Sequence, residues 1–366
     1  MVETIRTDVL VVGGGGAAAR AAIEADVEGA EVILATKGRF GAIGVRGGGA
    51  TGISISEAAG ASGFGRVGNR GMTAEQVYDD VIQVGLGMTD RKLAQVMVDD
   101  TAASRQALEE WGSVFPGGEG MGGRQHGVPI MDTMTRVVAR SDVRLLERCS
   151  VTDLVVSNGE CVGAVGIGEE GERYIFQCKA VILATGGAGQ LYQFNMNPNC
   201  VTGDGYYLGY RAGAELMNME FAQIFLGTVY PTINIVHRWA WERGEKITNS
   251  AGEEFLDGYI PSGGSLKQAQ VEHAQHNPFS TRDEFSRYID IGMITEVVEG
   301  RGDEHDALHM HLSDPQAVPA SLREWYHYRG IRWEEGPLQV GICHHCSNGG
   351  IVIDENGQST VPRLYA

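Results

Sequence analysis

Cysteine is scarce in this sequence, with six residues among 366, and only Cys343 and Cys346 lie close together. So few thiols in so long a chain exclude the disulfide framework of a small secreted protein. Basic residues are also in deficit, at 29 against 47 acidic ones, which gives a net charge of −18. Because phosphate neutralisation takes an excess of lysine and arginine, this deficit argues against a nucleic-acid partner.

Long apolar runs and a recognisable leader are lacking as well. The most apolar stretches, such as residues 8–25, carry charges at their ends and fall short of a membrane-spanning helix, which argues against direct membrane insertion. The first residues do not show the basic end, apolar run and small-residue cleavage site of a signal peptide. Together with thiols that we expect to be reduced, these absences predict a cytoplasmic protein.

Glycine, in contrast, is abundant, with 53 residues, many of them in clusters beside apolar runs. Such clusters let the backbone approach a ligand closely. The cluster at 13–16 follows a predicted buried strand at 9–12 and precedes a helix of small residues. Within it Gly13, Gly15 and Ala18 match the dinucleotide fingerprint, in which a tight turn brings the backbone to a pyrophosphate at the helix N-terminus.

A second predicted strand, at 30–37, stands at the spacing that a βαβ unit needs and ends in Thr36 and Lys37. Thr36 occupies the place where an acidic residue usually binds the ribose hydroxyls, and its hydroxyl group can make one of those hydrogen bonds. Strand, fingerprint, helix and second strand in register predict a nucleotide-binding domain. The alternative is a glycine-rich turn in some other α/β protein.

Residues 73–112 carry the periodicity of helices that serve as scaffold. Thr73 and Thr89 are the expected N-caps, because acidic residues stand in the first helical turn after each of them.

The following segments predict a domain that is interrupted. Short alternating runs over 143–182, with turns at 158–159 and 170–171, predict a small β-meander. It leads into a buried strand, "AVILATGG", which we expect to rejoin the first sheet. Residues 215–335 are more aromatic and polar, and we interpret them as an inserted domain.

Six segments occur in one order along the chain. They are "VLVVGGGGAAARAAIEA", "AVILATGGAGQLY", "TGDGYYLGYRAGAELMNMEFAQ", "KITNSAGEEFL", "STRDEFSR" and "GGIVIDENGQSTVPRLYA". In this order the sequence resembles the flavoprotein subunits of succinate dehydrogenase and fumarate reductase, over essentially the whole chain. The wider group includes L-aspartate oxidase and the flavoprotein subunit of adenylylsulfate reductase.

The resemblance implies an α/β fold, in which a discontinuous Rossmann-like FAD-binding domain with a small β-meander is interrupted by an inserted α+β capping domain. The FAD-binding domain then comprises residues 1–214 and 336–366, and the capping domain comprises 215–335. The resemblance also implies hydride transfer between flavin N5 and a small organic acid, and its implied partner is an iron–sulfur protein that transfers electrons. Relatives continue beyond "VPRLYA", so we expect a truncated or split member.

The resemblance further implies which residues contact FAD. Gly41 stands where membrane-bound relatives attach FAD through a histidine, so we expect non-covalent FAD. The implied contacts are glycine-rich turns and a few polar side chains near the pyrophosphate, the adenosine and the flavin ring. They are Gly13, Gly15, Gly16, Ala17, Thr36, Lys37, Gly47, Gly48, Thr185, Gly186, Gly187 and Asp204.

For catalysis the resemblance implies four residues. Arg282 in "STRD" resembles the family's proton donor to the substrate carbon. Glu242 and Arg243 resemble part of a relay that replaces this proton, and a surface ion pair is the alternative for them. His345, in the pattern His-x-x-x-Gly-Gly, resembles the histidine that binds a substrate carboxylate.

Three interpretations of the segment around Cys343 and Cys346 remain open, and we give them in order of preference. The first is the substrate-site His345 and the second is a redox dithiol. Zinc comes third, because a structural site needs four ligands and the sequence has no second short-spaced pair. We therefore expect no metal.

One departure from the relatives bears on the substrate. Phe225 and Leu226 stand at and beside the position of a histidine that holds a second carboxylate in relatives. An apolar pair cannot satisfy a buried carboxylate, so we expect an organic acid other than a standard dicarboxylate. The alternatives are an electron-transfer flavoprotein that is adenylylsulfate-reductase-like or thiol/disulfide-linked, and a scaffold that binds FAD poorly.

Overall fold

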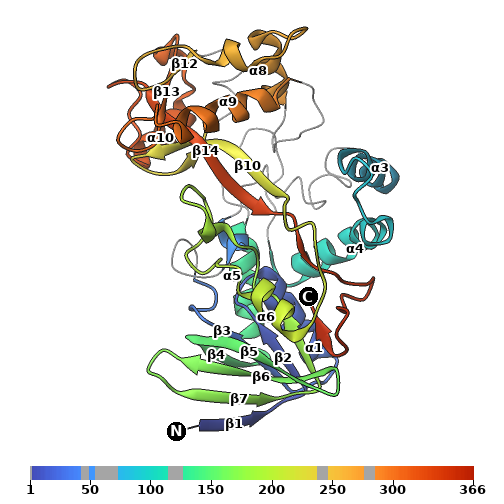
Figure 1. Ribbon diagram of the computed structural model, residues 1–366. Coiled ribbons are helices and arrows are strands. Elements are labelled where there is room, and N and C mark those ends of the chain that lie inside the picture. The colour runs from blue at the N-terminus through green and yellow to red at the C-terminus, as the bar shows by residue number, and fades with distance from the viewer. Residues whose placement is uncertain (1, 43–48, 54–72, 114–126, 237–245, 276–284) are drawn as a thin grey trace.

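The computed structural model describes residues 2–42, 49–53, 73–113, 127–236, 246–275 and 285–366. In Figure 1 the strands labelled β1 to β7 form the lower part, and β12, β13 and α8 to α10 form the upper part. The long strands β10 and β14 lie antiparallel between the two parts, and β14 runs from the upper part toward the lower one. Both ends of the chain lie in the lower part, and α3 and α4 stand beside it.

A five-stranded parallel sheet organises the lower part, in the order β16-β8-β2-β3-β4. Its strands are β2 (Val9–Val12), β3 (Val32–Thr36), β4 (Arg144–Glu147), β8 (Ala180–Leu183) and β16 (Leu364–Tyr365). The central strands are apolar on both faces, as a parallel sheet covered on both sides requires. Val11 and Leu34 pack with the helices, whereas Leu10 and Ile33 belong to the core on the opposite face.

Two helices cover the first face of this sheet, and they are α1 (Gly16–Val27) and α5 (Gly127–Val138). The small residues of α1 explain its close approach to the strands, because Ala18 and Ala22 are fully buried in the same core as Val11 and Leu34. The predicted strand–glycine turn–helix–strand unit is thus present, and the strand within "AVILATGG" joins the sheet beside β2, as predicted.

The second face is covered by a four-stranded sheet in the order β1-β7-β6-β5. Its strands are β1 (Val2–Arg6), β5 (Cys149–Ser157), β6 (Glu160–Gly168) and β7 (Arg173–Gln177). Strands β5, β6 and β7 are the predicted meander, and Asn158 and Gly159 take the positive φ angles that the tight turn needs.

Two details of this region differ from the prediction. Residues 144–147 were expected in the meander, but they form an edge of the parallel sheet as β4. The meander also gains β1, which pairs in parallel with β7. The pattern of a short strand does not encode which sheet it joins, because that choice depends on partners far along the chain.

Helix α3 (Ala74–Val84) and helix α4 (Arg91–Glu110) fill the predicted helical segment. Thr73 caps α3 through a reciprocal capping box with Gln76, as predicted. The predicted cap Thr89 is wrong. The carboxylate of Asp90 caps α4 instead, because it accepts hydrogen bonds from the backbone N–H groups of Lys92 and Leu93 at 2.8 and 3.1 Å.

An antiparallel sheet in the order β11-β10-β14-β13-β12 organises the upper part. Its strands are β10 (Ala222–Tyr230), β11 (Asn234–Ile235), β12 (Lys246–Thr248), β13 (Leu308–His311) and β14 (Leu338–Ser347). The helices of this part are α8 (Leu266–Gln275), α9 (Arg287–Val298) and α10 (Ala320–Tyr328). Leu308 and Val340 from the sheet share one apolar core with Ile289 and Met293 from α9.

Shorter elements complete the description. Helix α6 (Asp204–Ala212) precedes β9 (Leu216–Met217), which pairs with β15 (Gly350–Ile351). Four 3-10 helices of the described ranges lie at Ala50–Ile53, Gly189–Leu191, Leu256–Tyr259 and Pro315–Ala317.

The mixed α/β fold class is confirmed by these sheets, while the exact domain boundaries stay a prediction. One strand departs from the division that we predicted at residue 336. Strand β14 begins at Leu338, within the segment predicted to return to the FAD-binding domain, and it pairs with β10 and β13 of the upper sheet.

The buried carboxylate of Glu296 links α9 to neighbouring segments of the upper part through hydrogen bonds. Glu296 is 3% exposed and accepts two hydrogen bonds of 2.7 Å from the guanidinium of Arg301. The amide of Asn249 and the hydroxyl of Tyr259 donate to the same carboxylate at 3.1 and 3.0 Å. These donors, with Arg301 first, lower the pKa of Glu296 from 4.5 to about 2 despite the opposing effect of burial.

We expect Glu296→Gln to destabilise the protein by roughly 2–3 kcal/mol at pH 7. Because the folded-state pKa is depressed, the carboxylate stabilises the fold above pH 4.5, and this contribution is lost as the pH falls toward 2. The difference in free energy of unfolding between wild type and variant should therefore be smaller in acid. Urea unfolding at pH 7 and pH 3 measures it, with Glu299→Gln as the exposed control on the same arginine. An equal gap at both pH values would contradict the argument.

Candidate functional site

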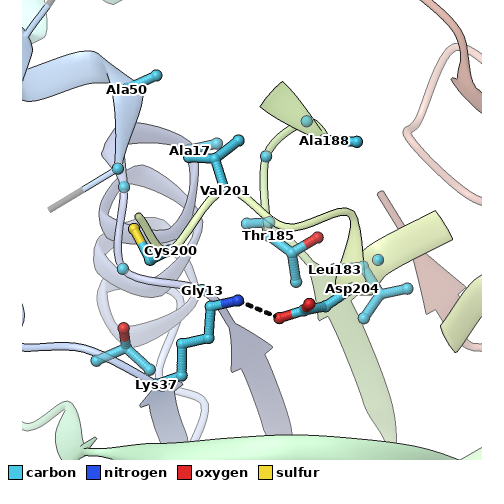
Figure 2. Close-up of a pocket in the computed structure, with 18 of the residues that line it drawn as sticks. Gly13, Ala17, Lys37, Ala50, Leu183, Thr185, Ala188, Cys200, Val201 and Asp204 are labelled. Carbon is cyan, nitrogen blue, oxygen red and sulfur yellow. Dashed lines mark hydrogen bonds and ion pairs between the residues drawn. The ribbon is translucent and has the colours of Figure 1, made fainter. Parts of the chain in front are cut away.

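A cavity of about 440 Å³ lies where β2, β3 and β8 end, a volume in the range of small-molecule and cofactor sites. Ligands of open parallel sheets bind at this place, outside the carboxyl ends of the strands. The loop 13–17, residues 36–38 and residues 183–188 supply its walls from the sheet side. The remainder comes from the segments 49–51, 149–151 and 200–206, from the end of β14 and from single residues elsewhere. Figure 2 shows part of this lining.

The glycine loop brings backbone to the cavity in a way that side chains would prevent. Gly13 has a φ of +138°, and a Cβ placed there would lie 2.2 Å from the carbonyl oxygen of Ala184. A Cβ at Gly14 would lie 2.4 Å from Oγ1 of Thr36. The loop therefore accepts no side chain at either position without a shift of its neighbours.

Helix α1 starts directly after this loop with its N-terminus at the cavity. Its N-cap is Gly15, which has no side chain to cap the first N–H groups, and its first turn contains no acidic residue. The N–H of Gly16 donates to Oγ1 of Thr51 at 3.2 Å. Free N–H groups at a helix N-terminus attract an anion, so the loop has the chemistry of a pyrophosphate site.

A lysine and an aspartate meet across the cavity wall. Lys37 follows β3, and its Nζ lies 2.6 Å from Oδ2 of Asp204, the first residue of α6. Figure 2 shows this pair, with Thr185 and Cys200 nearby. The hydroxyl of Thr202 donates to Oδ1 of Asp204 at 2.6 Å and also contacts Lys37 Nζ. The positive charge of Lys37 is therefore already balanced within the protein.

The turn after β8 forms another wall. Thr185 packs on the first turn of α6, since a Cβ at Gly205 would lie 2.1 Å from its Oγ1. Gly186 has a φ of +76°, which favours glycine at this turn.

Most residues that the sequence analysis assigned to FAD line this cavity. They are Gly13, Gly15, Gly16, Ala17, Thr36, Lys37, Thr185, Gly186, Gly187 and Asp204. Five predicted site residues lie outside the residues that the structure describes, and they are Gly47, Gly48, Glu242, Arg243 and Arg282. Sequence reasoning missed further lining residues from distant segments, among them Asn197, Cys200, Tyr206 and His344.

The structure brings His344 rather than His345 to the cavity wall. A β-bulge explains the difference, because Gln223 pairs with Cys346 and Ile224 with His344, which leaves His345 without a partner residue in the ladder. His345 Nδ1 lies 2.6 Å from Oε1 of Gln223. Burial lowers the pKa of His345.

The two cysteines of the segment differ in environment. Cys343 is fully buried beside Phe225 in an apolar cluster, and burial raises its pKa to about 12. Cys346 lines the cavity, with Sγ 3.3 Å from Oε1 of Gln223. Residues three apart on a strand have Cα atoms about 10 Å apart, beyond the roughly 7 Å limit for a disulfide. This strand therefore disfavours the dithiol interpretation.

The described residues contain neither a candidate metal site nor a candidate membrane span. No group of three or more His, Cys, Asp or Glu side chains there is arranged to hold a metal ion. No helix of the described ranges is long and apolar enough to cross a membrane.

Comparison with known sequences places the chain among flavoproteins. A family profile described as "FAD binding domain" matches residues 8–366. A subunit of the fumarate reductase (CoM/CoB) of Methanothermobacter marburgensis is 28% identical, and the match covers 100% of this chain and 67% of that protein. L-aspartate oxidase of Streptomyces coelicolor is 27% identical, over 99% of this chain and 63% of that protein. The chain thus spans about two thirds of the length of these relatives.

Solved structures agree with this placement. Sdh1 of Mycobacterium smegmatis in complex with UQ1 superimposes with a TM-score of 0.76 at 25% identity, covering 100% of this chain and 63% of that chain. Adenylylsulfate reductase of Archaeoglobus fulgidus shares the fold, with a TM-score of 0.66 at 21% identity and coverage of 100% and 65%. The chain belongs to the FAD binding domain family, with FAD as its cofactor, among the FAD-dependent oxidoreductases that include fumarate reductase, succinate dehydrogenase flavoprotein and L-aspartate oxidase.

Proposed function

We propose that this chain holds FAD in the cavity at the strand ends and acts as an oxidoreductase on a small organic acid. The observation that carries the proposal is the side-chain-free loop 13–16 leading into the uncapped N-terminus of α1. FAD supplies hydride transfer at its N5 atom when it is bound. The residues of the chain bind it, orient the acid and provide the proton that accompanies the hydride.

The lining residues fit the parts of FAD by their chemistry. The backbone of Gly13, Gly15, Gly16 and Ala17 suits the pyrophosphate. Thr36 and Lys37 follow β3 and suit the adenosine side with hydroxyl and ammonium donors. Thr185, Gly186, Gly187 and Asp204 are proposed to contact the remainder of the dinucleotide, and Gly47 and Gly48 to lie along the flavin ring.

We propose that the FAD is held without a covalent bond. Gly41, at the position where membrane-bound relatives carry a histidine, has no side chain that could form one. Acid precipitation should therefore release the flavin into the supernatant. A pellet that keeps its flavin fluorescence in a denaturing gel would show that the attachment is covalent.

Arg282 is proposed to donate the proton to the substrate carbon, with Glu242 and Arg243 as part of the relay that restores it. An arginine has a pKa far above neutral, so it serves as an acid only toward a strongly basic carbon. His345 is proposed to bind a substrate carboxylate, and it lies on the bulge of β14 with Gln223 as its hydrogen-bond partner.

The substrate is proposed to differ from a standard dicarboxylate. Phe225 and Leu226 are 1% and 0% exposed, and each belongs to an apolar cluster of the upper part. At these positions β10 offers a carboxylate no hydrogen-bond donor from a side chain, and an unpaired buried carboxylate costs several kcal/mol.

A screen that uses reduced viologen, a dye that donates electrons, tests this function. Oxidation of the dye would be followed with fumarate, other unsaturated acids, adenylylsulfate and disulfides as acceptors. We expect turnover with an unsaturated acid and slow turnover with fumarate. Rapid fumarate reduction would refute the argument from Phe225, and activity with disulfides alone would favour the thiol-linked alternative despite the buried Cys343.

Partners and location remain proposals. Several relatives are named as subunits, which supports an electron-transfer partner, and an iron–sulfur protein is the proposed one. Co-purification of a protein that carries iron and acid-labile sulfide would support it.

The cytoplasmic location stays a prediction, which cell fractionation tests.

A further inference from the structure

A histidine with none of the roles above lies at the cavity end of β14. His344 is 2% exposed, and its ring stacks on Tyr192 with centroids 4.1 Å apart and planes at 13°. Its Nδ1 lies 3.5 Å from Nδ2 of Asn197, and its Nε2 lies 3.4 Å from Oγ of Ser347. Both separations are at the long limit of hydrogen bonding, so these two contacts satisfy the buried ring nitrogens only weakly.

The charge and tautomer of His344 follow from its neighbours. Burial, aided by the nearby His345, lowers the pKa of His344, so the ring is neutral near pH 7. A neutral imidazole carries one N–H donor and one acceptor nitrogen. Since the amide nitrogen of Asn197 only donates, we assign Nδ1 as the acceptor and Nε2 as the donor.

This donor belongs to a row of neutral polar groups along the cavity wall. Ser347 lies between His344 and Tyr206, and the Tyr206 hydroxyl is hydrogen-bonded to the Ser347 side chain. A Cβ at Gly187 would lie 3.7 Å from both Ser347 Oγ and the Tyr206 hydroxyl. The row therefore lies next to the glycine turn that follows β8, and all three polar residues line the cavity.

Strand β14 connects this wall to the upper sheet. Leu338 and Val340, at its start, are buried in the apolar core of the upper part. His344 and Ser347, at its end, line the cavity of the lower part. Figure 1 shows the strand running between the two parts. A ligand that holds the lower end of β14 therefore also restrains the strand at the centre of the upper sheet.

We propose that His344 is a cofactor-positioning residue, whose imidazole hydrogen-bonds to FAD in this cavity and so ties β14 and the upper sheet to the cofactor. The proposal rests on the proposed function, because it requires FAD in the cavity. FAD carries hydroxyl, carbonyl and phosphate oxygens, any of which could accept a hydrogen bond from the Nε2–H.

The variant His344→Phe tests the proposal. It keeps an aromatic ring to stack on Tyr192 and removes both ring nitrogens. We expect the Kd for FAD, measured by quenching of flavin fluorescence on the apoprotein, to rise about five- to tenfold, the worth of one net hydrogen bond. Hydrogen exchange of the amides of 338–347 is a second readout. FAD should slow it in the wild type and slow it less in the variant.

A matched control is His327→Phe, the same change on α10, whose histidine pairs with Glu334 and does not line the cavity. We expect its Kd for FAD to stay within about twofold of wild type. If circular dichroism shows that His344→Phe does not fold, His344→Leu carries the same expectation. A wild-type Kd and unchanged β14 protection in the folded variant would overturn the role of His344 alone. A wild-type chain that binds no FAD would overturn the proposed function as well.

Discussion

Gly13→Ala should abolish the retention of FAD, with an affinity lower by about 100-fold or more. The new methyl group would lie 2.2 Å from the carbonyl oxygen of Ala184 and 2.7 Å from its carbonyl carbon. These are backbone atoms next to β8, so they cannot rotate away as a side chain can, and the loop must leave the cavity wall. The measurement is flavin content after gel filtration, followed by titration of the folded fraction with FAD.

Gly29→Ala is the control for the backbone part of this effect. Gly29 also has a positive φ, +84°, but a Cβ there would meet no atom within 4 Å. Its change to alanine should cost roughly 1 kcal/mol of stability and leave FAD binding intact. If Gly13→Ala binds FAD as the wild type does, the loop is not the pyrophosphate site.

Arg282→Ala should lower turnover by a factor of about 100 to 10,000, the usual contribution of a positioned proton donor. The content of bound FAD should not change, since Arg282 is proposed to act on the substrate. The measurement is kcat with the acid identified by the viologen screen, together with the flavin-to-protein ratio.

The matched control is Arg287→Ala, a change of the same residue type at the exposed start of α9. It should leave kcat within about twofold of wild type, as expected for a surface substitution. Normal turnover in a folded Arg282→Ala variant would place the protein outside the mechanism that its relatives imply. A loss of stability without a loss of kcat per folded molecule would make Arg282 a structural residue.

Local patterns predicted the glycine loop and the strand and helix on either side of it. The sequence places Gly13 directly after an apolar strand and Ala18 within a helix of small residues, and this succession of local preferences is enough to specify the loop. The capping box at Thr73 and the turn at Asn158 were equally readable, because each depends on residues within a few positions.

Features that depend on residues far apart in the sequence could not be predicted from local patterns. The edge strand β4 looked like part of the meander, since alternation does not show which sheet a strand joins. The bulge at His345 changes which neighbour reaches the cavity, and no signal in "CHHC" marks it. Lys37 and Asp204 each matched a family position, but their ion pair joins the end of a strand to a helix far along the chain.

The parallel sheet draws its strands from the whole length of the chain. Val9 pairs with Ala180, and Val181 in turn pairs with Leu364, so the cavity floor joins the first residues to the last. Contacts so distant in sequence are slow to form, because the entropy of closing a long loop is lost before the contact stabilises the fold. The amount of bound flavin per chain therefore measures the fraction of molecules in which the whole parallel sheet has formed. A spectroscopic probe placed in the βαβ unit would report only on the folding of that unit.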